Sequence, residues 1–342
     1  MNLAFPRKPP LSGKGLTVLA GDAGGTKTNL ALFRATPGNM EPLKETTYHS
    51  SSYSSIIDIL KQFLAENGNP LPDRICLGVA GPVLNGKVEL TNLSWKLDSE
   101  ELSESTGVED VFLINDLEAT AFGLEGLGDK DYATIHPGAP DSGGNMAILA
   151  PGTGLGEAGL FWDGSVYHPF ATEGGHSDFD PRTLLDISLL QYLQKKYGIV
   201  SWERVIAGPG IYDIYEFLLR EKKTEEPGWF KKAIQEEDPS AVISQAAVDR
   251  TDPLCIETMD LYVRYLARES SNLVLKMKAT GGLFLGGGIP PKISSLLKDQ
   301  SFYQNFLDCD RMQNLLKDVP VRVILNNKTA LLGAAWYGAF GS

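Results

Sequence analysis

Two glycine-rich turns contain the residue types that could hold phosphate groups. They lie in LAGDAGGTKTNLALF (residues 19–33) and AILAPGTGLGEAGLFW (residues 147–162), and the apolar runs on both sides of each turn predict β-hairpins. Backbone N–H groups at glycines can converge on phosphate oxygens, so two such turns facing each other could hold a nucleoside triphosphate. Asp22, Thr26 and Thr153 add polar side chains to the turns. The alternative is that both are only tight hairpin connections.

Neither turn fits the better-known phosphate-binding patterns. GDAGGTKT (residues 21–28) departs from the P-loop pattern by one residue, because Thr26 stands at the second glycine position. A P-loop also opens a helix, whereas the NLALF that follows is typical of a returning strand. The same argument excludes the dinucleotide fingerprint at GTGLG (residues 152–156), which continues into the strand-like EAGLFW.

A carboxylate stands at the end of an apolar run in LINDLEATAFG (residues 113–123). Asp116 could accept the proton of a substrate hydroxyl, and phosphoryl transfer needs little more, because catalysis there is mostly positioning and charge neutralisation. The alternative is that Asn115 and Asp116 form a helix N-cap pair, which is the commoner use of these residues at such a place.

The EGGH segment (residues 173–176) is the clearest candidate for ligand recognition. Gly174 and Gly175 carry no side chains, so Glu173 and His176 could converge on one small polar object. A carboxylate and an imidazole together suit a polyhydroxylated ligand. The alternative is a capped turn. Glu203, in SWERVIAGPGIYDIY (residues 201–215), is by itself typical of a surface helix charge.

Composition limits the classes of protein. The 342 residues are enough for two domains. A net charge of −12 argues against nucleic acid and anionic membranes as partners. No apolar stretch approaches the roughly 20 residues that cross a bilayer. The N-terminal MNLAFPRKPPLSGKG has no apolar signal core, so we expect a short flexible leader and a cytoplasmic protein. Cys76, Cys255 and Cys309 are too scattered for a disulfide framework or a zinc site, and the four histidines lack ligand spacing.

The elements that must position these residues follow from apolar periodicity and turn residues. The first third predicts a mixed α/β unit, and a long helix beginning at Thr251-Asp252-Pro253 carries an apolar face from Met259 to Met277. The other expected elements are a hairpin over 16–35, a helix capped by Ser54 and ending at Asn67-Gly68, strands at 74–81, near 88–90, at 111–116, 281–290 and 319–325, a helix from Asp98 with a capping box to Glu101, helices at 184–198 and 330–337, and a charged loop or frayed helix over 220–240.

The ordered set of motifs resembles the bacterial glucokinases, which are sugar kinases of the hexokinase, Hsp70 and actin-like ATPase superfamily. The resemblance extends from about Leu16 to Gly338. Any one motif is weak, but their order is specific. The motifs are GDAGGT, TNLSW (residues 91–95), INDLEA, PGTGLG, EGGHSDF, WERVIAGPGIYDIY and LFLGGGIPPK.

The resemblance implies a ribonuclease H-like fold, that is, two α/β domains around a central cleft with ATP between them and the sugar at the cleft base. It implies a leader over 1–15, a small domain over 16–115 and 325–342, and a large domain over 116–324. It implies that Asp116 is the catalytic base and that Asn115, Glu173, His176 and Glu203 bind the other sugar hydroxyls. The implied ATP contacts are Gly21, Asp22, Ala23, Gly24, Gly25, Thr26, Gly152, Thr153, Gly154, Gly286, Gly287 and Gly288, and Asp22 would approach Mg²⁺ through water.

Three departures from the family pattern bear on the assignment. Lys27 stands where a glucokinase often has Asn, and a lysine at this position is more like the ROK sugar kinases. The cysteine-rich zinc motif of those kinases is replaced by DFDPRTLLD, so no structural zinc is expected and the non-ROK branch is favoured. The leader has no counterpart with an assignable role.

These observations predict an ATP- and Mg²⁺-dependent glucokinase that makes glucose 6-phosphate, the entry step of glycolysis, and the family implies a homodimer. The first alternative is a kinase for another hexose or an amino sugar, because EGGH does not select an epimer. A second is a sugar-sensing regulator without catalysis, which would need a DNA-binding segment before the first turn. A third, a chaperone- or actin-like ATPase, would lack EGGH.

Overall fold

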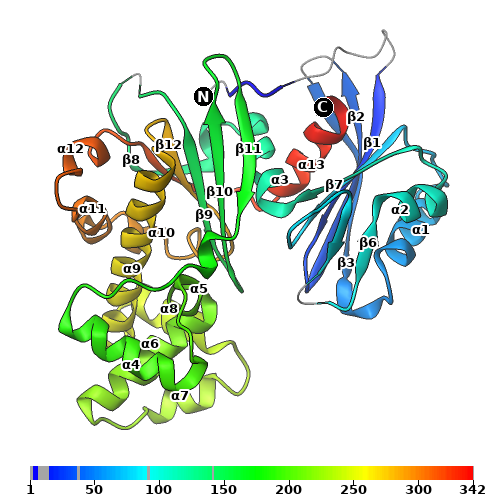
Figure 1. Ribbon diagram of the computed structural model, residues 1–342. Helices are drawn as coiled ribbons and strands as arrows, with labels where there is room; N and C mark the ends of the chain where they lie inside the picture. Colours follow the sequence, from blue (N-terminus) through cyan, green and yellow to red (C-terminus); the bar gives the residue numbers. More distant parts are fainter. Residues whose placement is uncertain (1–2, 7–14, 37–38, 91–92, 141, 342) are drawn as a thin grey trace. The chain divides into compact units, whose positions relative to one another are not determined.

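The structure is a computed structural model that describes residues 3–6, 15–36, 39–90, 93–140 and 142–341, and the chain divides into two compact α/β units (Figure 1). Unit 1 comprises Met1–Lys130, Leu160–Ala171 and Asn326–Ser342. Unit 2 comprises Asp131–Gly159 and Thr172–Leu325. No helix within the described ranges is both long and apolar enough to span a membrane.

Unit 1 is built on a five-stranded sheet in the order β3-β2-β1-β4-β7. β1 pairs with β2 antiparallel and with β4 parallel, and β4 pairs with β7 parallel, so the carboxyl ends of β1, β4 and β7 share one edge of the sheet. The strands are β1 (Leu16–Ala23), β2 (Lys27–Thr36), β3 (Asn39–His49), β4 (Arg74–Val79) and β7 (Asp110–Asn115), and β5 (Lys87–Glu89) pairs separately with β6 (Lys96–Asp98).

Both faces of the unit 1 sheet are covered, because neighbouring residues of each strand point to opposite faces. Leu19 of β1 points to one face and is buried in a hydrophobic cluster with side chains of α1. Its neighbour Ala20 points to the other face and is buried in a cluster with side chains of α13. Small residues on the second face let α3 and α13 pack closely. The helices are α1 (Ile56–Glu66), α2 (Ser99–Thr106), α3 (Asp116–Gly123) and α13 (Thr329–Phe340), with short 3₁₀ turns η1 (Ser50–Ser52), η2 (Leu124–Gly126) and η3 (Asp129–Asp131).

Unit 2 contains most of a six-stranded sheet in the order β11-β10-β9-β12-β13-β8. β9, β12 and β13 are parallel to one another, and β8 is antiparallel to β13. The bounds are β8 (Tyr132–His136), β9 (Met146–Pro151), β10 (Leu155–Trp162), β11 (Tyr167–Thr172), β12 (Gly282–Leu285) and β13 (Val321–Ile324).

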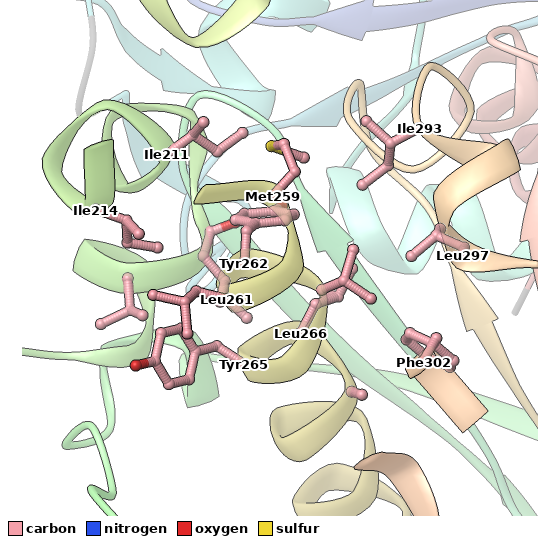
Figure 2. Packing of buried hydrophobic residues seen from close by; sticks show 14 of the residues in the cluster. Ile211, Ile214, Met259, Leu261, Tyr262, Tyr265, Leu266, Ile293, Leu297 and Phe302 are labelled. Carbon is pink, nitrogen blue, oxygen red and sulfur yellow. The ribbon is translucent and has the colours of Figure 1, made fainter. Parts of the chain in front are cut away.

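The core of unit 2 surrounds the long helix α9 (Pro253–Met277), whose apolar face was expected from its periodicity. Figure 2 shows Met259, Tyr262 and Leu266 of this helix packed among side chains of α6, α10 and α11 and of the loop before α10. The remaining helices are η4 (Gly174–His176), α4 (Leu184–Tyr197), α5 (Trp202–Ile206), α6 (Gly208–Lys222), α7 (Gly228–Ala233), α8 (Pro239–Val248), α10 (Ser294–Leu297), α11 (Gln300–Leu307) and α12 (Gln313–Leu316).

Three details differ from expectation. α1 is capped by Ser55 rather than Ser54, since Asp58 N–H donates to Ser55 Oγ at 3.3 Å. The Asp98 side chain accepts from Glu100 N–H, so it caps α2 one position earlier than a capping box would. The described part of the N-terminal leader is packed: Leu3 and Phe5 are buried in unit 1, with the Phe5 ring 5.2 Å from that of Phe122. Residues 7–14 lie outside the described residues.

The division between units also differs from the expected domains. Residues 116–130 fall in unit 1 because α3 packs against α13 and the sheet. Residues 160–171 also fall in unit 1, where Tyr167 N–H donates to Ala4 O at 2.8 Å. Thr91 and Asn92 of the TNLSW motif lie outside the described residues.

Candidate functional site

The first glycine turn joins β1 to β2 and is braced by a residue that no motif marks. Gly24 N–H donates to Lys27 O at 3.0 Å and closes the turn. The fully buried Ser50 donates from Oγ to Gly24 O at 2.8 Å and from its backbone N–H to Thr26 O at 3.0 Å. These bonds occupy three turn carbonyls, the groups that would repel a phosphate.

Asp22 lies at the carboxyl end of β1, beside this turn. Its side chain is partly buried, and Asn29 Nδ2 donates to its Oδ2 at 3.3 Å. Burial raises the pKa of Asp22 above its ordinary value, and the Asn29 hydrogen bond offsets only part of that rise. A nearby cation would favour the ionised carboxylate. Across the described ranges, no group of three or more His, Cys, Asp or Glu side chains could hold a metal ion.

Asn115 and Asp116 lie where β7 ends and α3 begins, so the helix-cap interpretation holds for Asn115. Its Oδ1 accepts from Leu117 N–H at 2.9 Å, and Glu118 Oε2 accepts from Asn115 N–H at 3.1 Å, which completes a capping box. Asn115 Nδ2 donates to Gly81 O at 3.2 Å. Most of the hydrogen-bonding capacity of Asn115 is therefore used in positioning the strand end and the helix.

Asp116 occupies the first position of α3, at the sheet edge that also holds Asp22. Leu117 N–H donates to Asp116 Oδ1 at 3.0 Å, which orients the carboxylate. Gly78 on β4 lies between the two strand ends: a Cβ there would be 3.6 Å from Gly21 O and 3.9 Å from Asp116 Cα. Unit 1 therefore brings the first glycine turn and the candidate base to one edge, as parallel strands require.

The second glycine turn, Gly152–Gly154, joins β9 to β10 in unit 2. Gly152 N–H donates to Gly154 O, and Gly208 N–H, at the start of α6, donates to Gly152 O, both at 2.8 Å. The 286–288 loop follows β12 and is anchored beside the end of β9, where Gly286 N–H donates to Leu149 O at 2.9 Å. Two glycine segments that are far apart in the sequence are thus brought together.

A cavity of about 710 Å³ opens beside these two segments. Its walls come from the glycine turn, the N-terminal end of α6, the loop into α8, α8 itself and the 286–288 loop. No motif identified the lining residues of α8 and of the loop before it, because these side chains carry no local signal. They include Ser240, Ala241, Ser244, Gln245 and Val248, whereas the lining residues Pro209, Tyr212, Ile289 and Lys292 belong to the motifs WERVIAGPGIYDIY and LFLGGGIPPK.

Glu203 contacts the second glycine turn directly. Leu155 N–H donates to Glu203 Oε2 at 3.0 Å. A Cβ at Gly154 would lie 2.8 Å from the same oxygen, so the carboxylate can approach this closely only because residue 154 is a glycine. The interpretation of Glu203 as a solvated surface charge is thereby excluded.

The EGGH turn lies beside the start of α5. Trp202 N–H donates to Ser177 O at 2.9 Å, and Phe179 N–H donates to Val200 O at 2.9 Å. Glu173 precedes η4 and His176 ends it; Glu173 Oε2 and His176 Nε2 are 3.9 Å apart, and both side chains are 62% exposed. Unit 2 therefore gathers Glu173, His176 and Glu203 on adjoining segments, next to the glycine turn that Glu203 contacts.

Comparison with known proteins gives one family over nearly the whole chain. The family model described as Glucokinase matches residues 19–339. The glucokinase of Synechocystis is 41% identical over 345 residues, covering 94% of this chain and 97% of that protein. The glucokinase of Nostoc punctiforme is 39% identical over 333 residues, covering 93% and 97%.

Solved structures that are similar to this one also include glucokinases. The crystal structure of a glucokinase from an Antarctic psychrotroph has a TM-score of 0.81 at 30% identity, covering 94% of this chain and 98% of that one. The glucokinase of Balamuthia mandrillaris in complex with glucose has a TM-score of 0.78 at 21% identity, covering 95% and 93%, which is a likeness of fold. The chain belongs to the glucokinase family, the kinases that phosphorylate glucose with ATP.

Proposed function

We propose that Asp116 is the catalytic base of this glucokinase and that Glu173, His176 and Glu203 bind the hydroxyls of the sugar. The observation that carries the proposal is the hydrogen bond from Leu155 N–H to Glu203 Oε2 at 3.0 Å. This bond holds Glu203, a candidate sugar-binding residue, against the glycine turn proposed to bind phosphate. Asp116 would accept the proton of the sugar 6-hydroxyl as that oxygen attacks the γ-phosphorus. Asn115 holds the strand end and the start of α3 in place, and its amide adds a polar group for the sugar.

ATP binding is assigned to the glycine segments of both units. Within the turn from Gly21 to Thr26, the carbonyls of Gly24 and Thr26 accept hydrogen bonds from Ser50, which favours an amide surface toward phosphate. The turn Gly152–Gly154 contributes a second amide surface. The 710 Å³ cavity beside Gly152 and Gly288 has the size and the mixed lining that suit adenosine. Gly286 and Gly287 directly precede Gly288 in the loop that forms one side of the cavity.

Mg²⁺ fits the donor chemistry at Asp22. A partly buried carboxylate whose pKa is raised by burial is stabilised by a cation, and a single protein carboxylate suits a Mg²⁺ ion that arrives on ATP and keeps its waters. When bound, the metal would neutralise charge on the transferring phosphoryl group. The remaining steps belong to the chain: Asp116 accepts the proton, and the sugar-binding residues orient the hydroxyl.

The finer assignments follow from family membership. We infer a ribonuclease H-like arrangement of each α/β unit, entry of glucose into glycolysis, a cytoplasmic location and a homodimer. Glucose is the proposed physiological acceptor. A kinase for another hexose or an amino sugar remains the second candidate, because the exposed Glu173 and His176 side chains do not by themselves select an epimer.

The experiment is ATP- and Mg²⁺-dependent phosphate transfer to a panel of hexoses and amino sugars, run beside Asp116→Asn. Turnover on glucose that is lost in the variant supports both the acceptor and the base. Preferred turnover on another sugar would keep the base and change the acceptor. Undiminished turnover in Asp116→Asn would refute the assignment of the base.

A further inference from the structure

Two acidic side chains are buried against each other in unit 2, next to the EGGH turn. Glu157 on β10 is 2% exposed, and Glu269 on α9 is fully buried. Burial and the charge of Glu269 raise the pKa of Glu157, so the two carboxyl groups lie close enough to interact. Two ionised carboxylates can only accept hydrogen bonds, so a bond between neighbouring carboxyl groups requires a proton on one of them. Two negative charges in a buried space would also repel each other strongly.

The surroundings supply less than one full positive charge for the pair. Asn272 Nδ2 donates to Glu269 Oε2 at 2.8 Å, and Lys276 Nζ lies 3.4 Å from Glu269 Oε1. The Lys276 side chain is 52% exposed, so water weakens its effect. Glu157 Oε1 is buried and receives no hydrogen bond from a protein N–H or hydroxyl. These contacts identify Glu269 as the ionised partner and Glu157 as the one that carries the proton.

The Glu157 carboxyl group also packs against the backbone of the EGGH turn at Gly174. A Cβ at Gly174 would overlap Oε2 and Cδ of Glu157, so the turn rests directly on this carboxyl group. Thr172 links the two: its Oγ1 donates to Glu157 O at 3.2 Å and accepts from Gly174 N–H at 3.2 Å. Any displacement of the Glu157 carboxyl therefore moves the backbone that carries Glu173 and His176.

We propose that Glu157 and Glu269 share one proton and, as a pair, are positioning residues that hold the EGGH turn in its sugar-binding geometry. The proposal rests on the sugar-binding role proposed above for Glu173 and His176. Loss of the proton would place two charges in contact beneath Gly174 and push the turn away. The shared proton would then set an alkaline limit on sugar binding, without a direct effect on Asp116.

The direction of the pH dependence follows from the groups that face the pair. Burial and the Glu269 charge raise the pKa of Glu157 to about 8, and Lys276 opposes this rise. Burial also raises the pKa of Glu269, against hydrogen bonds from Asn272 and Lys276. The flanking groups on η4, Glu173 and His176, are largely exposed. The pair thus keeps its proton at neutral pH and loses it as the pH rises through about 8.

The first test is the pH profile of the KM for glucose, with kcat and the KM for ATP measured in parallel. In the wild-type protein the KM for glucose should rise above pH 8 by up to roughly tenfold per pH unit, the limit for one proton, with kcat nearly unchanged. Glu157→Gln keeps a donor to Glu269 but cannot ionise, so its KM for glucose should stay flat. Glu269→Gln removes the repulsion and should flatten the profile as well.

Glu257→Gln is the matched control. It lies on the same helix, is 44% exposed and pairs with Lys222 at 3.0 Å, so it should keep the wild-type profile. An equal alkaline rise in the wild-type protein and in both buried Gln variants would overturn the proposal. A change confined to kcat would overturn it too, since a brace of the sugar turn acts on binding.

Thermal unfolding separates the possible failures. The protonated form of Glu157 is favoured in the folded state, so its stabilising effect is complete below the ordinary glutamate pKa and is lost as the pH rises to about 8. The Tm of Glu157→Gln relative to wild type should therefore increase over that window and then level off. A flat difference would refute the shared proton. If Glu173→Ala leaves the KM for glucose unchanged, the proposed sugar role itself has failed, whatever the unfolding data show.

Discussion

Glu203 Oε2 accepts a hydrogen bond from the backbone N–H of Leu155 at 3.0 Å, and this bond ties the start of α5 to the glycine turn between β9 and β10. The carboxylate can come this close because Gly154 has no side chain. One residue therefore lies at two proposed sites, with one oxygen on the phosphate turn and the rest of the carboxylate available to a sugar.

Glu203→Ala should impair both substrates. Removing the acceptor leaves the buried Leu155 N–H without its partner and loosens the turn, and it also removes a charged hydrogen-bonding group, worth about 1.5–3 kcal/mol, from the sugar. We expect the KM values for glucose and ATP both to rise, roughly 10- to 100-fold for glucose. Glu203→Gln retains an acceptor and should spare the KM for ATP. An unchanged KM for ATP in Glu203→Ala would show that the Leu155 bond does not shape the turn.

Asp116→Asn should abolish turnover and preserve binding. The amide keeps an oxygen for Leu117 N–H but cannot take up a proton, so kcat should fall by roughly 100- to 10,000-fold, the range of a positioned general base. The dissociation constant for glucose, followed by tryptophan fluorescence, should change little. The control is Asp129→Asn, which changes an exposed carboxylate at the start of η3 in the same unit. A comparable loss in the control would point to folding rather than to chemistry.

Filling the cavity beside Gly152 should affect the nucleotide selectively. Ala241 lines the cavity, and its side chain is exposed there. Its backbone N–H donates to Asp238 Oδ1 at 3.0 Å, and a substitution of the side chain keeps this helix-capping bond. Ala241→Trp should raise the KM for ATP while leaving the KM for glucose within twofold, since an ordinary surface change costs about 0.5 kcal/mol or less. Ala241→Ser should resemble the wild type. An unaltered KM for ATP in the Trp variant would exclude this cavity as the adenosine site.

Asp22→Asn should weaken the use of Mg²⁺-ATP while stabilising the protein without ligands. Burial raises the pKa of Asp22, so in the wild type this group contributes stability below its ordinary pKa and loses it as the pH rises. The neutral amide escapes that loss, and its Tm at pH 7 should exceed that of the wild type. The KM for Mg²⁺-ATP should rise at the same time. Titration with Mg²⁺ and a thermal melt test both effects, and a lower Tm for Asp22→Asn would contradict the argument.

Asp186→Ala should destabilise unit 2. Asp186 is fully buried and accepts from Arg268 at 2.6 Å, Arg264 at 2.7 Å and Tyr265 at 2.9 Å. Burial by itself would raise the pKa of this carboxyl, but hydrogen bonds from Arg268, Arg182 and Thr183 and the charge of Arg264 hold it well below its usual range. Alanine leaves two arginines unpaired, at a cost of about 3–5 kcal/mol in the free energy of unfolding. Denaturant unfolding measures it.

The control for Asp186→Ala is Asp180→Ala. The Asp180 side chain is 61% exposed and 3.8 Å from Arg182, so its removal should cost about 1 kcal/mol or less. Equal losses in the two variants would mean that the buried cluster contributes no more than a surface pair.

The sequence alone predicted most of the elements. The hairpin around the first glycine turn, the strand before Asp116 and the long helix after Asp252 are all present, because each is specified by neighbours in the chain: period-2 or period-3.6 patterns, and an Asp-Pro start. The order of the motifs also indicated the family, which the comparisons confirm. The Ser55 cap was missed because Ser54 and Ser55 are equivalent as sequence signals and only the backbone geometry separates them.

What only the tertiary structure decided concerns residues that meet across long stretches of chain. Ser50 braces the first turn, Glu203 reaches Leu155, and Glu157 meets Glu269, although none of these pairings leaves a local pattern. The sequence around Leu3 and Phe5 likewise predicted a flexible leader, whereas both side chains are buried in the folded structure. Local patterns record what a segment does alone, whereas burial, hydrogen-bond partners and a carboxyl pKa depend on whatever the fold places beside it.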